Sequence, residues 1–423
     1  MIENNEISRR RFLQGSAAIV LTSGLTRSAS AELPKNIKPK SVAAVITAYE
    51  NGLHADVLVG KILEGWKQDG GIGPALTLSS MYVEQFTDRD QARAMSKKHN
   101  VPLFDTIEKA VTVGTNGIPV DGVISIGEHG TYPYNEKEQH LYPRRRFFEE
   151  ITDTFKKYGK VVPVFNDKHL GPVWSDAKWM YDRAKELKVP FMAGSSMVVT
   201  FRDPPINVPM NCEIESAVGI GYSGLDIYGF HALDSFQSLV ERRRGAESGV
   251  KWVQYLNGNA MWKVLDDGVI SKETFNAALA KVTPTQEGVR QAADASLFLF
   301  QYNDGFMGAV FMLPAFATGN AVALKLKGRS ELLTTRFEER REPHYPHFAY
   351  LLKGIERMIH TGKVSYPIER TLLTGGILDR ALTSRVQKQE RLMTPELAIS
   401  YQPVDYPYAP NPDLLSDPTK PLS

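Results

Sequence analysis

The stretch "GKVVPVFNDKHLGPVWSDAKWMYDRAKELKVPFMAG", residues 159–194, decides the fold. Its apolar run "VVPVF" is typical of a buried strand, "DAKWMYDRAKELK" has apolar residues at helical spacing behind a capping Ser175, and "VPFMAGSS" is a second strand. A strand, a crossover helix and a strand in this order form a parallel pair. Lys168 and His169 follow the first strand, at the carboxyl edge where open α/β sheets bind ligands.

The same alternation of strands and helices extends over residues 40–200. Apolar runs such as "SVAAVITAY", "PALTLSSMYV" and "VDGVISIG" read as strands, and segments with helical periodicity separate them. We therefore expect an α/β fold whose N-terminal domain, residues 40–200, is a Rossmann-like, doubly wound parallel sheet.

From residue 201 onward the pattern is that of an α+β domain. "ASLFLFQYNDGFMGAVFML" predicts two strands joined by an Asn-Asp-Gly turn, and "NAVALKLKG" predicts a third strand. Long helices are predicted over residues 346–363 and 368–386. We expect residues 201–392 to form an α+β domain with an open, mostly antiparallel sheet, and residues 393–423 to form a Pro-rich C-terminal arm. The apolar face of that sheet predicts a homo-oligomer.

Composition and charge exclude several classes of protein. With 42% hydrophobic and 23% charged residues, the chain of 423 residues resembles a soluble globular protein of two domains. Fifty basic against 48 acidic side chains leave a net charge of +2, which predicts neither a nucleic-acid nor a membrane-surface partner. The single cysteine, Cys212, excludes an intrachain disulfide. The spacing of His129 and His140 matches no metal-ligand motif, so no metal is predicted.

Residues 1–31 have the three regions of a twin-arginine signal peptide. "SRRRFL" at residues 8–13 fits the twin-arginine pattern, a weakly apolar core follows, and "ASA" at residues 29–31 fits a cleavage site. The core is too short for a stable membrane span. We expect the twin-arginine translocase to export the folded protein, which predicts a periplasmic location.

The turn after the first strand, "ITAYENGLHADV", is where a dinucleotide would meet the N-terminus of a helix. Tyr49, Asn51, Gly52 and His54 are the candidate cofactor contacts in this turn. The G-x-G-x-x-G spacing is absent, and Tyr49 and Glu50 place bulk and negative charge where phosphate would lie. Taken alone, this turn argues against ordinary NAD binding.

Further candidate residues follow the next strands. Glu84 ends the second long strand, where an acidic side chain accepts the ribose 2′-hydroxyl and favours NAD over NADP. His129 directly follows the strand "VDGVISIG" and is a candidate cofactor contact. The loop after it contains Tyr134 and leads to Arg144, and both are candidates to hold the substrate. A solvated helix start explains the arginine equally well.

Two motifs resemble those of the Gfo/Idh/MocA family of oxidoreductases. The strand–helix–strand stretch resembles the family's G-K-x-V-x-x-E-K-P-L-A region, with "DKHL" at residues 167–170 in place of Glu-Lys-Pro-Leu. "LDIYGFHALDSFQSLV" is similar to the family's G-x-H-x-x-D segment, with Gly229, His231 and Asp234 at the matching positions. The resemblance covers about residues 40–390, largely as a common order of elements.

This resemblance implies hydride transfer between a nicotinamide cofactor, NAD or NADP, and a sugar or polyol. By position, Lys168 and His231 are the implied acid/base pair, because hydride loss from a carbinol carbon requires removal of the hydroxyl proton. Lys168 is also an implied cofactor contact. Asp234, and Asp226 near the family's aspartate position, are the implied carboxylates of the site. His169 and Arg370 complete the candidates for contact with the substrate.

Two other functions remain open at this point. The same scaffold could perform redox-neutral sugar chemistry, such as elimination or glycoside cleavage through a transiently oxidised ring. It could also be a carbohydrate-binding protein without cofactor, which the altered first turn favours and the retained Lys168 and His231 oppose.

Overall fold

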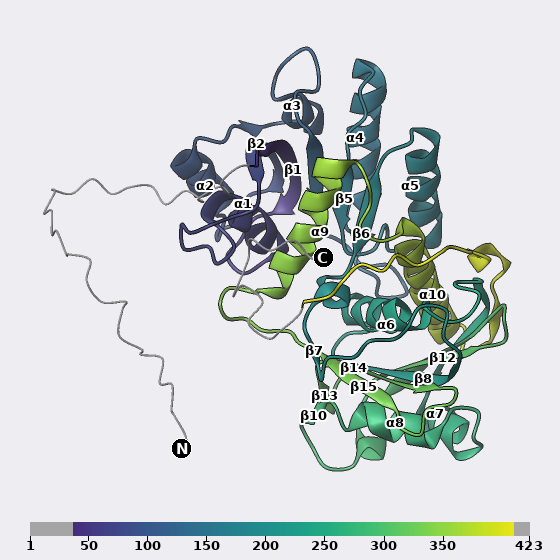
Figure 1. The fold of residues 1–423 in the computed structure, drawn as a ribbon. Helices are drawn as coiled ribbons and strands as arrows, with labels where there is room; N and C mark the ends of the chain where they lie inside the picture. The colour runs from purple at the N-terminus through teal and green to yellow at the C-terminus, as the bar shows by residue number, and fades with distance from the viewer. Residues whose placement is uncertain (1–36, 410–423) are drawn as a thin grey trace, which may run out of the picture.

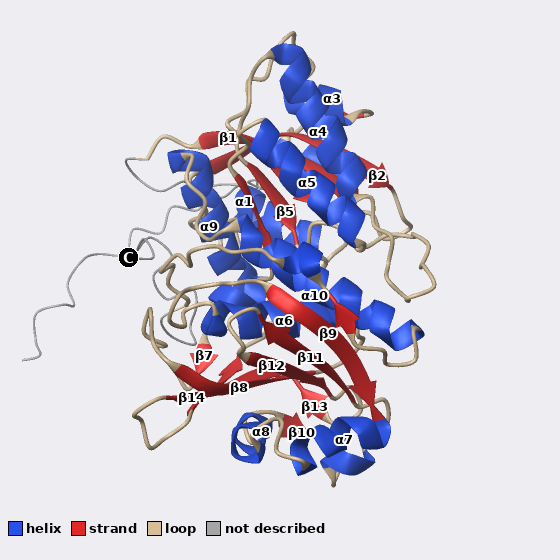
Figure 2. Ribbon diagram, turned by 90° about the vertical axis from the view of Figure 1, so that its right-hand side faces the viewer, coloured by secondary structure: helices blue, strands red, loops and turns tan. Residues whose placement is uncertain are grey.

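The computed structural model describes residues 37–409. The predicted signal peptide, residues 1–31, lies outside the described residues, as do residues 410–423. Two sheets with helices between them make up the molecule (Figures 1 and 2). None of the helices between residues 37 and 409 has the length and apolar character of a membrane span.

The first sheet confirms the predicted Rossmann-like architecture. Its six strands are all parallel and have the order β3-β2-β1-β4-β5-β6, so the strand order reverses between β1 and β4. In α/β sheets of this kind, ligands bind at the carboxyl ends of the strands beside that reversal. The strands are β1 (Lys40–Ala48), β2 (Leu76–Gln85), β3 (Leu103–Phe104), β4 (Gly122–Ile126), β5 (Val164–Asp167) and β6 (Phe191–Gly194).

Helices cover both faces of this sheet because alternate residues of its strands are apolar on either side. In β1, Ala43 and Val45 pack toward α3, α4 and α5, whereas Val42, Ala44 and Ile46 pack toward the opposite layer. The helices on the first face are α3 (Ile107–Thr112), α4 (Arg144–Tyr158) and α5 (Trp174–Glu186). On the other side lie the π-helical turn η1 (Asp56–Gly60), α1 (Lys61–Glu64) and α2 (Ala92–His99). Since α5 begins at Trp174 behind Val173, Ser175 lies inside the helix and does not cap it.

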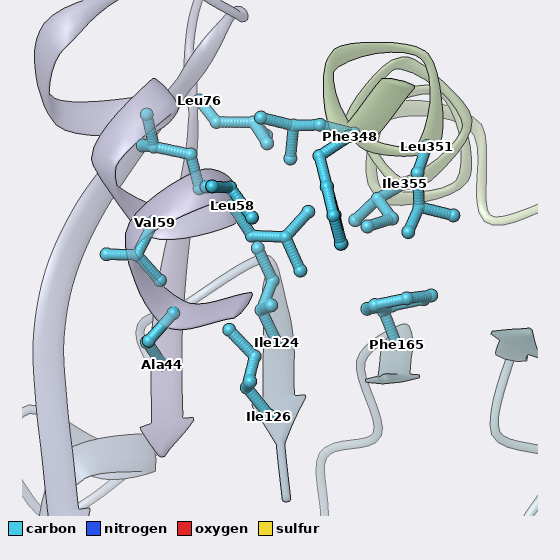
Figure 3. Packing of buried hydrophobic residues seen from close by; sticks show 14 of the residues in the cluster. Ala44, Leu58, Val59, Leu76, Ile124, Ile126, Phe165, Phe348, Leu351 and Ile355 are labelled. Atoms are coloured by element: carbon cyan, nitrogen blue, oxygen red, sulfur yellow. The ribbon is translucent and has the colours of Figure 1, made fainter. Parts of the chain in front are cut away.

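Helix α9 (His347–Thr361) completes the first domain although it lies within the segment 201–392 that the sequence assigns to the second. Its Phe348, Leu351 and Ile355 point toward Leu58 of η1 and toward Ile124 and Phe165 of the parallel sheet (Figure 3). Complete burial of an apolar side chain of this size contributes roughly 1.5–3 kcal/mol. The chain therefore returns from the second domain to cover the first sheet.

The second sheet has eight strands in the order β16-β9-β11-β12-β8-β14-β15-β7 and is antiparallel except between β12 and β8. The predicted hairpin around the Asn-Asp-Gly turn is confirmed, since β11 pairs with β12 across it. The strands are β7 (Arg202–Asp203), β8 (Ile214–Gly221), β9 (Val250–Asn257), β11 (Ser296–Tyr302), β12 (Met307–Met312), β14 (Asn320–Leu326), β15 (Leu333–Phe337) and β16 (Leu392–Met393); β10 (Thr283–Pro284) and β13 (Ala317–Thr318) form a separate small pair.

Helices also cover both faces of the second sheet, which corrects the expectation of an exposed apolar face. α6 (Ile227–Val240) and α10 (Ile368–Val386) lie between the two sheets, and α7 (Gly258–Asp266) and α8 (Lys272–Leu279) cover the far side (Figure 2). Trp262 and Phe275 pack on Phe311 of the far face. The exposed apolar face from which a homo-oligomer was predicted is therefore absent among the described residues.

The C-terminal arm lies along the same chain. Tyr401 forms an isolated bridge with Glu247, and the Ala409 N–H donates a hydrogen bond to the Val199 carbonyl with N and O 2.8 Å apart. Val199 belongs to the 3₁₀ turn η2 (Ser196–Val199) that follows β6. The arm thus connects the outer edge of the second sheet with the end of the first.

Candidate active site

Titratable side chains gather at the carboxyl ends of β1, β4 and β5, where the strand order reverses. His54 begins the helix after β1, Glu128 and His129 follow β4, Asp167 ends β5 and Lys168 follows it. The Lys168 Nζ donates a hydrogen bond to Glu128 Oε1 at 2.9 Å, and the His54 Nδ1 lies 2.5 Å from Asp167 Oδ2. These contacts bring together three segments that are far apart in the sequence.

Glu128 is the centre of a buried charge cluster. Its side chain is 0% exposed, and the Arg144 guanidinium donates to its second oxygen. Burial alone would raise the pKa of Glu128, but Lys168 and Arg144 hold it well below its usual range. Glu128 is therefore ionised and fixes the Lys168 ammonium group from one side.

Two residues of this cluster have a strained backbone. His129 has φ 70° and Lys168 has φ 61°, in the left-handed region that residues with a side chain rarely occupy. Such conformations cost of order 1–3 kcal/mol each and are concentrated at active sites and ligand clamps. Both strained residues lie directly after neighbouring parallel strands, at the ligand-binding edge.

His231 reaches the same region from the second domain. It lies in the first turns of α6, and its Nδ1 lies 2.6 Å from the hydroxyl of Ser195, which directly follows β6. That hydroxyl also accepts a hydrogen bond from the Met197 N–H. Burial and the Lys168 cation lower the pKa of His231 well below its ordinary value, so the imidazole is neutral at physiological pH.

The expected carboxylates are close to His231 but do not contact it. Asp234 Oδ2 accepts the Ser195 N–H at 2.8 Å, and Asp226 Oδ2 accepts the His140 N–H at 2.9 Å. Burial raises the pKa of both aspartates to about 6. Asp234 therefore acts on the histidine only through the segment that contains Ser195.

The first βα turn is occupied by contacts of the chain itself. Glu50 accepts hydrogen bonds from Thr87 and Arg89 at the end of β2, and Asp56 accepts the Gly52 N–H at 2.8 Å. The Tyr345 ring lies over Gly52, where a Cβ atom would be 3.5 Å from it. Among the predicted cofactor contacts of this turn, Tyr49 is packed in the core, Asn51 is exposed and His54 binds Asp167.

Each of the remaining candidates has a partner within the chain. Glu84 is held by Arg146 and Tyr132, and Tyr134 is exposed and stacks on His140. Arg144 is buried against Glu128 instead of facing a substrate. The buried ring of His169 meets Phe230. Arg370 pairs with Glu241 beside a cavity that neither Lys168 nor His231 lines.

Three residues of the site were not among the candidates named from the sequence: Glu128, Asp167 and Ser195. Each of them ends or directly follows a strand of the parallel sheet, which is the signal that singled out Lys168 and His129. Their partners come from other elements, so only the fold identifies them. Among residues 37–409, no group of three or more histidine, cysteine or acidic side chains is placed to hold a metal ion.

Comparison of the sequence with family models and with curated proteins gives no match. Solved structures with the same fold include GenD2 from gentamicin A biosynthesis in complex with NAD, at 12% identity and TM-score 0.54, with 88% of this chain and 99% of that chain covered. Myo-inositol dehydrogenase from Lactobacillus casei, in complex with NAD(H) and myo-inositol, has 12% identity and TM-score 0.51 over 84% and 96%. A protein from Sinorhizobium meliloti that is assigned as a myo-inositol dehydrogenase has 11% identity and TM-score 0.52, with 84% of this chain and 99% of that chain covered. These similarities confirm the fold that the Gfo/Idh/MocA resemblance implies.

A nicotinamide dinucleotide is the cofactor that this fold implies, and the residues present fit it best where the strand order reverses. There the His129 Nε2 is buried without a hydrogen-bond partner among the described residues, as is typical of a group that a ligand completes. At the first turn, the helix N-terminus can bind an anion through its N–H groups. Glu50 and Asp56 place negative charge against an anion there, and the turn has Gly52 alone where this fold usually has several glycines.

Proposed function

We propose that this protein is a divergent Gfo/Idh/MocA-type oxidoreductase that transfers hydride between a nicotinamide cofactor and a carbinol carbon of a sugar or polyol. The observation that carries this proposal is the convergence of Lys168 and His231 from two domains at the edge where the fold binds ligands. The inositol dehydrogenases of the same fold support the choice of substrate class.

Lys168 and His231 have complementary roles in this proposal. Glu128 holds the Lys168 ammonium group in place. Hydrogen bonds from that ammonium group stabilise the oxyanion that forms as the substrate hydroxyl loses its proton. The neutral imidazole of His231 accepts that proton. A bound nicotinamide ring would supply the hydride acceptor, and we expect His54, His129 and Lys168 to contact the cofactor.

Ser195 allows His231 to act in both directions of the reaction. A serine hydroxyl can accept a hydrogen bond from Nδ1–H, which leaves Nε2 free to take a proton, or donate to Nδ1 when Nε2 carries the proton. A carboxylate partner would fix only the Nδ1–H form and raise the pKa of the imidazole. We therefore assign Ser195 as the residue that positions His231.

The test is the formation of reduced nicotinamide with a panel of inositols, aldoses and sugar acids. Lys168→Met and His231→Gln should each lower kcat/KM by roughly 10²–10⁴-fold, the usual contribution of a positioned acid or base. Lys178→Met is the matched control, because Lys178 pairs with Asp182 on the exposed side of α5. Unchanged turnover in both site variants would exclude this assignment.

A second candidate function is carbohydrate binding without a cofactor. The observation in its favour is the first βα turn, where Glu50, Asp56 and Tyr345 occupy the usual place of the pyrophosphate. Calorimetry separates the two functions. The redox function requires binding of NAD or NADP, whereas the alternative requires saturable binding of a sugar by protein that binds neither nucleotide.

We also propose export by the twin-arginine route, for which the sequence of residues 1–31 is the support. Folding before export allows a cofactor to be bound in the cytoplasm. N-terminal sequencing of the periplasmic protein should show Glu32, the residue after Ala31, as its first residue. Replacement of Arg9, Arg10 and Arg11 by lysine should retain the precursor in the cytoplasm. Normal export of that variant would contradict the proposal.

A further inference from the structure

A cavity lies at the junction of the two domains, and neither Lys168 nor His231 lines it. It has a volume of about 340 Å³ and is formed by η2, the C-terminal part of α6, the start of α10 and residues 404–408 of the arm. Asn207 and Asp405 are exposed at its rim, whereas Arg202 and Tyr366 lie deep inside. Its volume is in the range of small-molecule sites.

The cavity has an excess of positive charge. Arg370 pairs with Glu241 at 3.0 Å, and Arg242 pairs with Asp405 at 2.8 Å. The third arginine, Arg202, is 8% exposed and has no acidic partner among the described residues. Its guanidinium stacks 4.1 Å from the centre of the Tyr408 ring, donates one hydrogen bond to the Val198 carbonyl and leaves Nε without a partner.

Tyr366, which also lines the cavity, has a second donor without a partner among the described residues. The residue is 1% exposed, and its hydroxyl has no hydrogen-bond partner among residues 37–409. Arg370 lies over its ring, 4.7 Å from the ring centre. A buried polar group left unpaired destabilises the folded state, more so if it is charged, and native proteins contain few of them. Two such donors lining one cavity indicate a ligand that accepts hydrogen bonds.

We propose that this cavity binds a small oxyanion, with Arg202 and Tyr366 as donors to a carboxylate, phosphate or sulfate group. An anion would neutralise the charge of Arg202 and accept hydrogen bonds from the Arg202 guanidinium and the Tyr366 hydroxyl. Burial and the neighbouring Arg242 and Arg370 lower the pKa of Arg202 to about 9, which agrees with a missing counter-charge. The proposal stands on this cavity alone and does not depend on the redox function.

Such an anion has two conceivable sources, a free metabolite and the C-terminal part of the chain itself. Ala409 binds Val199 at the wall of the cavity, and the sequence continues with the carboxylates of Asp413 and Asp417. We assign the site to a free small molecule. A chain ending at Ala409 tests the other source, because it lacks every one of these carboxylates.

The experiment is isothermal titration calorimetry of the full chain, at low ionic strength, with inorganic phosphate, sulfate, citrate and glucuronate, and with glucose as the neutral control. We expect saturable binding of at least one anion at a single site and none of glucose. Arg202→Gln should weaken binding at least tenfold and Tyr366→Phe severalfold. Tyr49→Phe is the matched control, since Tyr49 also has a buried, unpartnered hydroxyl but lies in the first domain.

Tyr366→Phe keeps the test decisive if Arg202→Gln fails to fold, because it removes a hydroxyl that makes no hydrogen bond. Absence of saturable binding would overturn the proposal, as would equal affinities in the Tyr366→Phe and Tyr49→Phe variants. Binding seen only in the chain that ends at Ala409 would identify the tail as the occupant and also overturn it.

Discussion

Lys168 and Glu128 form an ion pair, with Nζ and Oε1 2.9 Å apart, that is almost completely withdrawn from solvent. Their side chains are 4% and 0% exposed, and they follow the neighbouring strands β5 and β4. Arg144 binds the other oxygen of Glu128. The pair therefore places a cation at the carboxyl edge of the parallel sheet. The carboxylate that holds this cation is itself bound by Arg144.

Replacing Glu128 by glutamine should destabilise the protein strongly. The change leaves two buried cations without their anion, and breaking a buried ion pair from one side costs about 3–5 kcal/mol. Urea denaturation measures the loss in free energy of unfolding. Glu213→Gln is the control, because Glu213 pairs with Arg244 and Lys327 at the surface and should change little. Equal stability of the two variants would show that the cluster does not hold Lys168.

Replacing Ser195 by alanine should lower kcat about tenfold and leave KM nearly unchanged. The imidazole of His231 would lose the hydroxyl that orients it, while the surface that binds the substrate stays intact. Ser195 also caps η2 through the Met197 N–H, so a stability loss of about 1 kcal/mol is expected as well. Steady-state kinetics over a range of pH measures the loss in kcat, and urea denaturation measures the loss in stability.

Ser196→Ala is the matched control for that experiment, since Ser196 is the next residue and is also buried. It should leave kcat unchanged. If Ser195→Ala lowers only the stability and keeps the pH profile of the wild type, the serine has a structural role and does not position His231.

Asp234→Asn should remove a pH dependence of stability. Burial raises the pKa of Asp234 to about 6, above the ordinary value of 3.8, so the folded state holds a proton that the unfolded state releases. The stabilising contribution is therefore complete below pH 4 and is lost as the pH rises through 6. A shift of this size corresponds to roughly 3 kcal/mol.

The asparagine variant retains an oxygen that can accept the Ser195 N–H. Compared with the wild type, it should be more stable above pH 7 and similar below pH 4 in thermal unfolding experiments. A constant difference between the two proteins across this range would mean that Asp234 does not titrate near pH 6.

The strand ends of the first domain could be predicted from the sequence because buried parallel strands are continuous apolar runs. Lys168, His129 and His54 therefore lie at the ligand edge where the pattern places them. Tyr49 shows the limit of that reasoning. It follows a strand like the others, but its ring packs into the core below the helix start and not toward the edge.

Contacts between segments that are distant in sequence could not be predicted in this way. Arg370 begins a helix near the expected site, yet its partner Glu241 comes from the far end of α6 and draws it to a cavity that Lys168 does not line. Helix α9 has the same amphipathic pattern whichever sheet it covers, so its return to the first domain depends on tertiary packing. The helices α7 and α8, which cover the second sheet, were not recognised from the sequence.

Replacing Glu50 by glutamine should strengthen dinucleotide binding. The buried carboxylate lies in the turn that faces the pyrophosphate in this fold, and removing its charge relieves a repulsion of about 1 kcal/mol, or roughly fivefold in Kd. Calorimetric titration with NAD and NADP measures the change. Glu108→Gln, on the exposed surface of α3, should leave Kd unchanged. Weaker binding in Glu50→Gln would mean that Glu50 supports the nucleotide.

Mass spectrometry of the supernatant from acid-denatured protein, purified without added nucleotide, shows whether the protein carries a nicotinamide cofactor. We expect one NAD or NADP for each chain, retained through purification beside His129 and Lys168. Protein that releases no nucleotide and also binds neither NAD nor NADP in calorimetry would contradict the proposed redox function. The cluster around Lys168 and His231 would then belong to a sugar site without redox chemistry.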